Sequence, residues 1–294
     1  MFNDVKIVEA VKSGKLDEAV VDRAADRMLT LMLKSKDALC DASYDKKAHH
    51  ELAAKICGQS VVLLKNDGNI LPLSKEKKVA VIGEMARAPR FQGAGSSLIN
   101  PTELSDAFEA LKGMGYQLSY APGYDKKTDA VSDVMEQDAC KIAKEADCVL
   151  LFIGLTEAYE SEGYDRSHLN LPTSHNHLLG EIAKVNSNVI VVLSGGSPVE
   201  MPFAGDVKAI LNGYLGGQAG GSAVVDIITG KVNPSGKLAE TYPVSLDTNP
   251  SYNFFPGGTK SVRYNESIYI GYRYYDTAEK EVLFPFGFGL SYTS

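Results

Sequence analysis

The chain has 294 residues and a formal net charge of −7, with 44% hydrophobic and 23% charged residues. This length suits one large or two modest domains, and it is enough for a core without disulfides or metals. The acidic balance argues against nucleic acid as the main partner, because phosphate binding needs concentrated Lys and Arg.

The first predicted element is a helix over residues 1–36. Ser13 is a candidate cap for it, with Asp17 and Glu18 in the first turn. The helix precedes the first strand and lies outside the repeating pattern that follows, so we assign it to a neighbouring module. Its apolar stripe, with spacings of three and four, comprises Val21, Ala24, Met28, Leu31 and Met32.

A second helix is predicted over residues 45–65, and strands then alternate with helices. The strand runs are almost continuously apolar, as in strands that are covered on both faces. Such alternation predicts an α/β fold with a doubly wound, mostly parallel sheet flanked by helices, a flavodoxin-like αβα sandwich. The predicted strands span residues 77–83, 116–123, 147–154, 188–196 and 208–217. The predicted helices span residues 102–114, 129–146, 173–186 and 219–230.

After about residue 240 the alternation fails, and Pro, Asn, Gly and Tyr dominate. Only residues 267–276, SIYIGYRYYD, alternate like a strand. We therefore expect three parts: residues 1–44 as a terminal helix and linker, 45–245 as the sandwich, and 246–294 as an extended segment that packs on it.

Cysteines and histidines give no metal pattern. Cys40, Cys57, Cys140 and Cys148 are scattered without a C-x-x-C pair, so we expect no metal and reduced, mostly buried thiols of a cytoplasmic protein. We interpret the five histidines, including His175 and His177, as solvated surface residues. No apolar run approaches the roughly 20 residues that span a bilayer, and the N-terminus has no apolar signal-peptide core. We expect no membrane partner, although a signal peptide could lie in a preceding domain.

Ligands of doubly wound sheets bind at the carboxyl ends of the strands, so a nucleotide motif would lie in the loops that follow them. After the first strand only Gly83 fits the G-x-G-x-x-G fingerprint, and no phosphate-binding loop or G-x-S-x-G motif occurs. LSGGSPVE (193–200) could bind an anion, but we favour a tight turn with positive φ. We attribute LGGQAGG (215–221) to close packing of helix on strand. No cofactor is expected.

One loop stands out, residues 155–172 after the third predicted strand. Sugar hydrolysis needs one protonated and one ionised carboxyl group, and crowding of like charges raises a carboxyl pKa. The alternative is a merely solvated acidic loop. The loop 155–172 holds four carboxylates within nine residues, next to Arg166. They are Glu157, Glu160, Glu162 and Asp165.

The chain resembles the C-terminal α/β sandwich domain of glycoside hydrolase family 3, the β-glucosidase group. The similarity lies in many separate motifs in family order, which together span nearly the whole chain. These motifs are SVVLLKNDGNILPL (60–73), KVAVIG (78–83), GAGSS (93–97), ESEGYDRSHLNLP (160–172), VVLSGGSPVEM (191–201), GYLGGQAGG (213–221), NPSGKLAETYP (233–243), YIGYRYYD (269–276) and LFPFGFGLSYTS (283–294).

The resemblance implies a retaining β-glycosidase in which a barrel domain supplies the aspartate nucleophile and this domain supplies the acid/base glutamate. The E-G-Y-D-R stretch assigns that role to Glu162, with Glu160 as the alternative. The GAGSS segment assigns a sugar contact to Ser96, with Ser97 as the alternative. Asp165 and Arg166 are expected to brace the loop.

The resemblance also implies what this sequence lacks. The family's barrel is missing except for its last helix, and so is a following fibronectin type III-like domain. We therefore expect a piece of a larger enzyme, inactive without the barrel in cis or trans, with a β-linked oligosaccharide or glucoside as substrate. An exposed barrel-facing surface would favour homo-oligomers. The alternative is a non-catalytic carbohydrate-binding or interaction module of the same fold.

Overall fold

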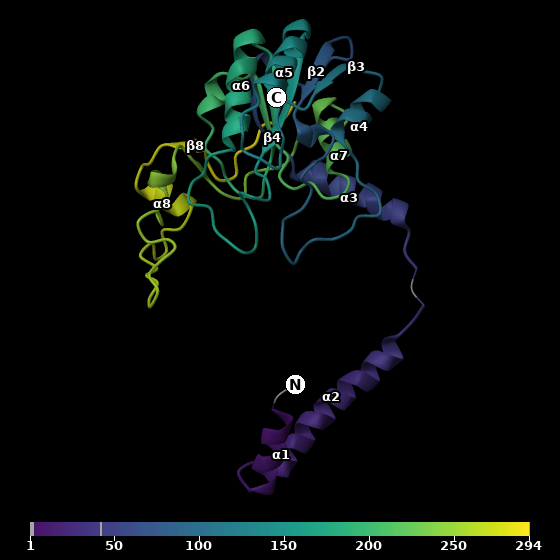
Figure 1. Cartoon of the computed structure of the whole chain (residues 1–294), viewed down its shortest axis with the longest axis vertical. Coiled ribbons are helices and arrows are strands. Elements are labelled where there is room, and N and C mark those ends of the chain that lie inside the picture. Colours follow the sequence, from purple (N-terminus) through teal and green to yellow (C-terminus); the bar gives the residue numbers. More distant parts are fainter. Residues whose placement is uncertain (1–2, 42, 294) are drawn as a thin grey trace. The chain divides into compact units, whose positions relative to one another are not determined.

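A computed structural model describes residues 3–41 and 43–293, which fall into two compact units that divide between Asp45 and Lys46. Figure 1 shows the whole chain, and each unit is described by itself. No helix within the described ranges is long and apolar enough to cross a membrane.

The first unit contains two helices, α1 (Asp4–Lys12) and α2 (Glu18–Ala38), rather than one continuous helix. The predicted cap at Ser13 is wrong, because Ser13 follows α1 and Asp17 caps α2 by accepting a hydrogen bond from the Ala19 N–H at 3.0 Å. Neither helix has a buried residue among those described. The apolar stripe of α2 is therefore uncovered within its own unit.

The second unit is built on a six-stranded sheet with the order β1-β6-β5-β4-β2-β3. Five strands are parallel, and β1 joins the edge antiparallel to β6. The parallel strands follow the flavodoxin-like order, which confirms the predicted fold class. The strands are β1 (Val62–Asn66), β2 (Lys78–Ile82), β3 (Gln117–Ala121), β4 (Cys148–Gly154), β5 (Val189–Ser194) and β6 (Ala209–Asn212).

Helices cover both faces of this sheet (Figure 1). Helices α5 and α6 pack together on one face, and α3, α4 and α7 pack together on the other. The central strand β4 is buried along its whole length, as its apolar sequence predicts. The helices are α3 (Lys46–Ser60), α4 (Ala107–Gly113), α5 (Asp133–Glu145), α6 (Thr173–Val185) and α7 (Gly220–Ile228).

Two sequence-based assignments in this unit are wrong. The helix predicted over 45–65 ends at Ser60, and the apolar run that follows it is β1. A short apolar run fits a buried helix and a buried strand equally well, and pairing with β6 decides between them.

The strand predicted over 267–276 is in fact irregular up to the short helix α8 (Tyr272–Thr277). Gly271, with a φ of 55°, interrupts the extended run just before this helix. The C-terminal segment also forms a two-stranded sheet, β7 (Tyr242–Pro243) with β8 (Val282–Phe284). Short 3₁₀ turns occupy Asp67–Asn69, Glu84–Ala86, Pro202–Gly205 and Leu246–Thr248.

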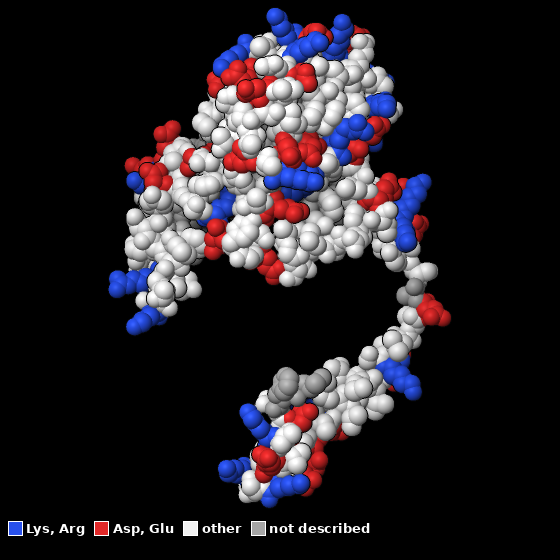
Figure 2. All heavy atoms as spheres, viewed as in Figure 1, with Lys and Arg blue, Asp and Glu red and all other residues white. Residues whose placement is uncertain are grey.

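The strand order reverses between β2 and β4, because β3 lies outside β2 while β5 and β6 lie beyond β4. At such a switch point the loops that leave the two strands diverge and open a crevice at the carboxyl edge of the sheet. On the face shown in Figure 2, acidic and basic side chains are interspersed.

Candidate active site

The loops after β2 and β4 meet at the switch point through Ser96 and Glu162. One carboxylate oxygen of Glu162, Oε2, accepts hydrogen bonds from the backbone N–H and the hydroxyl of Ser96, both at 2.6 Å. The two residues are 66 positions apart in the chain. The structure thus brings together two residues that the resemblance selected independently.

Gly95 makes this contact possible. Its φ is 94°, a conformation that side chains rarely adopt, and a Cβ atom at this position would lie 2.6 Å from Glu162 Oε2. Gly95, the second glycine of the GAGSS segment, is therefore required for two reasons: its backbone conformation and the close approach of Glu162.

Glu162 is exposed and has no cationic partner among the described residues. The hydroxyl of Ser96, and then its N–H, lower the pKa of Glu162 below its ordinary value because they stabilise the ionised form. The side chain borders an open hollow of about 570 Å³. The hollow is lined by Arg90, Gly93, Ala94, Ser96, Ser97, Glu160, Ser161, Glu162, Gly196 and Leu215.

Glu160, two residues earlier, has a different environment. Its carboxylate lies 2.5 Å from Arg90 Nη1 and accepts hydrogen bonds from the Gly196 N–H at 2.9 Å and from the Ser197 hydroxyl. Burial alone would raise the pKa of Glu160, but the hydrogen bonds from Ser197, Gly196 and Arg90 together lower it. Glu160 is thus held in an ion pair, whereas the Glu162 carboxylate forms none with residues 3–41 and 43–293.

The turn after β5 differs from the predicted one. Neither Gly195 nor Gly196 has a positive φ, and Gly196 instead donates its N–H to the Glu160 carboxylate. The anion that this turn binds is thus a side chain of the protein itself.

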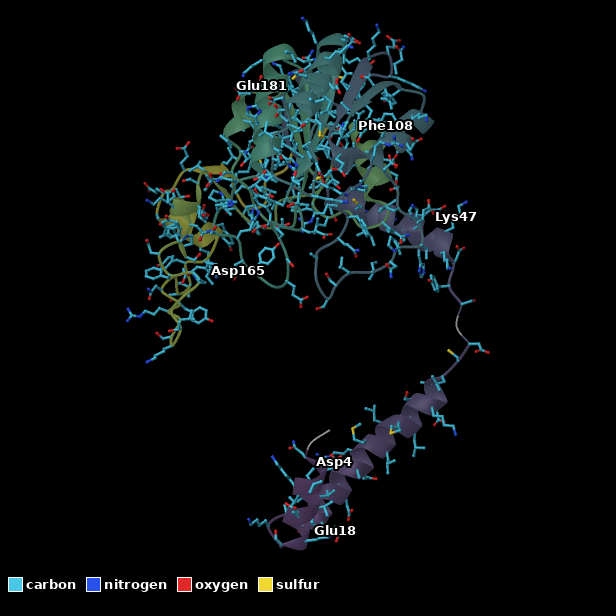
Figure 3. All side chains as sticks on the ribbon, in the orientation of Figure 1. Asp4, Glu18, Lys47, Phe108, Asp165 and Glu181 are labelled. Carbon is cyan, nitrogen blue, oxygen red and sulfur yellow. The ribbon has the colours of Figure 1, made fainter. Side chains whose placement is uncertain are left out.

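The other predicted site residues lie around these contacts. Ser97 lines the hollow but does not bond to Glu162. Arg166 donates to the Ser197 hydroxyl at 2.8 Å and to the Pro198 carbonyl at 2.9 Å, so it joins its loop to the turn after β5. Asp165 is exposed (Figure 3), and within the described residues its side chain has no hydrogen bond or ion pair.

The prediction that His175 is a solvated residue is wrong. It is 1% exposed beneath the end of β4, where its Nδ1 accepts a hydrogen bond from the Gly154 N–H at 3.2 Å. Its ring centroid lies 3.8 Å from that of Tyr124. Burial lowers the pKa of His175 to about 4, so the ring is neutral. His177 lies at the surface, 2.7 Å from Glu136.

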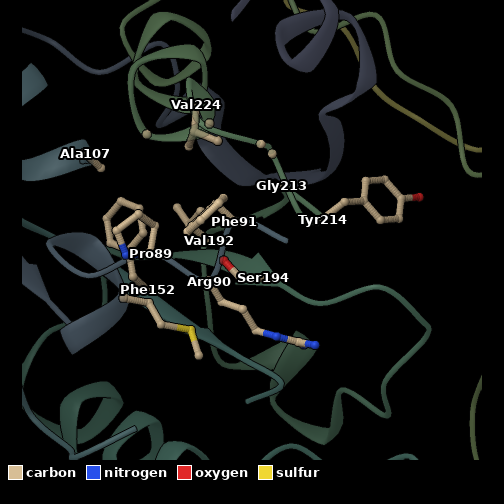
Figure 4. Close-up of a pocket in the computed structure, with 15 residues that line it drawn as sticks. Pro89, Arg90, Phe91, Ala107, Phe152, Val192, Ser194, Gly213, Tyr214 and Val224 are labelled. Carbon is tan, nitrogen blue, oxygen red and sulfur yellow. The ribbon is translucent and has the colours of Figure 1, made fainter. Parts of the chain in front are cut away.

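A small cavity lies under the loops (Figure 4). Its volume is about 40 Å³, and its wall includes Phe91, Phe152 and Val224. The guanidinium group of Arg90 points away from Ala107 and Val224 in this view. A cavity of this size has room for about one water molecule and not for a sugar. Among the described residues, no group of three His, Cys, Asp or Glu side chains could hold a metal ion.

These observations define a doubly wound α/β sandwich with a glutamate-bearing loop at its switch point. Residues 61–292 match the family model described as "Glycosyl hydrolase family 3 C-terminal domain". The chain therefore belongs to glycoside hydrolase family 3.

Its relatives are glycosidases of more than one specificity. The chain is 49% identical to thermostable beta-glucosidase B of Acetivibrio thermocellus, over 99% of this chain and 39% of the relative. It is 43% identical to an exo-alpha-(1->6)-L-arabinopyranosidase of Bifidobacterium breve, over 100% of this chain and 40% of the relative.

The solved structures agree with this assignment. The crystal structure of a beta-glucosidase of this family from Bifidobacterium adolescentis has a TM-score of 0.92 and 45% identity, covering 100% of this chain and 44% of that one. The chain thus spans about two fifths of the length of the proteins it matches.

Proposed function

We propose that this chain is the part of a retaining β-glycosidase that supplies the acid/base carboxylate, and that Glu162 is this group. The observation that carries the proposal is an exposed carboxylate on an open hollow at the switch point, without a cation partner in the part of the chain that the structure describes. Ser96 and Ser97 line the same hollow. We assign the sugar contact to Ser96, with Ser97 as the alternative. The nucleophile would come from a barrel domain outside these 294 residues.

In the first step Glu162 would protonate the departing glycosidic oxygen, and in the second it would take a proton from the attacking water. The hydrogen bonds from Ser96 favour the ionised form, which suits the second step. The first step needs the protonated form. A bound substrate that excludes water, and a second carboxylate about 5–5.5 Å away, would favour that form.

The surface of the chain supports a protein partner. In the second unit, residues 252–272 carry exposed Phe255, Tyr264, Ile268 and Ile270. The segment extends on the same side of the sheet as the site loops (Figure 1). In the first unit, α2 leaves its apolar stripe uncovered. Exposed apolar side chains in such numbers are typical of interaction surfaces, and the partner we propose is the barrel.

The test pairs this chain with the barrel, fused or as a separate chain, and compares Glu162→Gln with Glu157→Gln. Glu157 is an exposed glutamate of the same loop and serves as the matched control. Glu162→Gln should lower kcat/KM on alkyl β-glucosides by about 10²–10⁴-fold, and far less on aryl glucosides with good leaving groups. Equal losses on both substrates would refute the acid/base role.

The chain is 49% identical to a beta-glucosidase and 43% identical to an arabinopyranosidase. Because the beta-glucosidase is the more similar of the two, the substrate we propose is a β-glucoside. Turnover of an aryl β-glucoside well above that of an aryl α-L-arabinopyranoside would support this choice. The isolated chain should turn over neither. Tight oligosaccharide binding by the chain alone, unaffected by Glu162→Gln, would instead support a non-catalytic binding module.

A further inference from the structure

We infer that Arg90, Glu160 and Ser197 form a clamp that holds the loop after β4 so that the Glu162 side chain faces the hollow. The members of the clamp are positioning residues. The effect of the clamp on catalysis rests on the proposed role of Glu162. Its effect on the position of the loop is independent of that role.

The clamp connects three neighbouring strand ends through one carboxylate. Arg90 comes from the loop after β2, Glu160 from the loop after β4, and Ser197 from the turn after β5. These three strands are adjacent in the order β5-β4-β2. Arg90 Nη1 donates to Glu160 Oε2 at 2.5 Å, and the Ser197 hydroxyl donates to Oε1. The Gly196 N–H adds a third donor at 2.9 Å.

Arg90 also holds the backbone of the same loop at two points. Its Nη1 donates to the carbonyl of Leu155, at the start of the loop, at 3.0 Å. Its Nη2 donates to the carbonyl of Glu160 at 3.2 Å. A single guanidinium group therefore fixes both the beginning of the loop and the residue two positions before Glu162.

The loop beyond Glu160 is itself a tight unit. Ser161 and Tyr164 pair as an isolated antiparallel bridge, which closes a turn around Glu162 and Gly163. The Tyr164 hydroxyl donates to the carbonyl of Glu157. These contacts hold the turn together, so we infer that the anchor at Glu160 determines where Glu162 lies.

The ion pair of the clamp is largely buried. The side chains of Arg90 and Glu160 are only 6% and 16% exposed. If one partner of a buried ion pair is removed, the other charge is left uncompensated, and the loop must open to hydrate it. The arginine fork, which here makes contacts to three acceptors, is not replaceable by the single ammonium of lysine.

The first experiment uses the 294-residue chain and needs no activity. Among the described residues the Ser96 N–H donates to Glu162 alone, so its hydrogen exchange reports the position of the Glu162 side chain. Glu160→Gln and Arg90→Met should accelerate exchange of the Ser96 N–H, followed in the segment 93–97, at least tenfold, Arg90→Lys less, and the control Glu157→Gln not at all. Exchange in β4 and β5 verifies the fold.

Ser197→Ala is the milder variant, because it removes one hydrogen bond without leaving a buried charge unpaired. It should accelerate the same exchange by a smaller factor even if Arg90→Met fails to fold. Unchanged exchange at residues 93–97 in both Glu160→Gln and Ser197→Ala would overturn the clamp.

The second experiment measures kinetics with the barrel present. Glu160→Gln should lower kcat on alkyl β-glucosides about 10–100-fold, with a smaller change in KM and a smaller loss on activated aryl glucosides. A uniform loss on both substrate classes would show a purely structural role. If Glu162→Gln leaves the same assay unchanged while exchange still responds to Glu160→Gln, the proposed function fails and the clamp stands.

Discussion

The backbone N–H and the hydroxyl of Ser96 donate to the same oxygen of Glu162, each at 2.6 Å. This pair joins the loops that leave β2 and β4. A carboxylate that accepts two hydrogen bonds on one oxygen is favoured in its ionised form. The hydroxyl of Ser96 therefore stabilises the ionised form of Glu162, the candidate acid/base group.

Replacing Ser96 by Ala should raise the pKa of Glu162 towards its ordinary value, because the hydroxyl, the donor with the larger effect, is lost while the N–H remains. Carboxyl ¹³C NMR titration of the chain measures this change. Ser97→Ala is the control, since Ser97 lines the hollow without bonding to Glu162. An unchanged Glu162 titration in Ser96→Ala would show that the hydroxyl contact does not persist in solution.

Gly95→Ala should release Glu162 from the GAGSS segment. The added methyl would lie 2.6 Å from Glu162 Oε2, and the φ of 94° would cost a non-glycine residue roughly 1–3 kcal/mol. Because the loop is exposed, it should rearrange while the domain stays folded, so the Glu162 pKa rises with little change in Tm. Gly93→Ala is the control. A Cβ at Gly93 would lie 3.5 Å from its nearest neighbour, the Ser97 hydroxyl oxygen, so this variant should behave like the native chain. A native titration in Gly95→Ala would refute the close approach.

The sequence predicted the sandwich well because continuous apolar runs such as β4 identify strands covered on both faces. It failed where local pattern is ambiguous. The run that forms β1 is short enough for either a helix or a strand, and only its pairing with β6 distinguishes them. Aromatic alternation before α8 similarly suggested a strand, which Gly271 interrupts.

The candidate site was predictable only in part. Position at a strand end singled out the acidic loop after β4, and the family resemblance selected Glu162 and Ser96. Arg90 and His175 carry no such signal, because an arginine or histidine in a loop or helix start is usually solvated. Both are buried through distant contacts. Arg90 binds Glu160, 70 positions away, and His175 binds Gly154, 21 positions away. Sequence spacing does not reveal contacts of this kind.

The close packing of the glycines at the start of α7 is against the segment before α4, and not against a strand as the sequence suggested. A Cβ at Gly221 would lie 2.5 Å from the Ser105 carbonyl oxygen and 2.7 Å from backbone atoms of Asp106, whereas one at Gly220 meets nothing within 4 Å. Gly221→Ala should destabilise the domain by roughly 1–3 kcal/mol, and Gly220→Ala should be neutral or stabilising by up to about 1 kcal/mol. Urea unfolding measures both. Equal effects of the two substitutions would contradict the packing of α7 against the segment before α4.

His175 should make the stability of the chain depend on pH. Burial lowers its pKa in the folded state to about 4, from an ordinary 6.5, so between these values the unfolded chain binds more protons than the folded chain. The free energy of unfolding should therefore fall as pH decreases from 6.5 towards 4. The full contribution of this one ring is about 3 kcal/mol.

The variant His175→Asn tests this, because Asn keeps a hydrogen-bond acceptor for the Gly154 N–H but does not titrate in this range. We expect lower stability than native at pH 7, since the ring leaves a cavity, and a shallower loss of stability between pH 6.5 and 4. Hydrogen bonding to Glu136 raises the pKa of His177, which gives the opposite dependence and is common to all variants. His168→Asn, at an exposed position, should retain the native slope. Urea unfolding of the three proteins across this range supplies the slopes. If His175→Asn loses stability as steeply as the native chain, His175 is not the buried neutral group that the packing against Tyr124 requires.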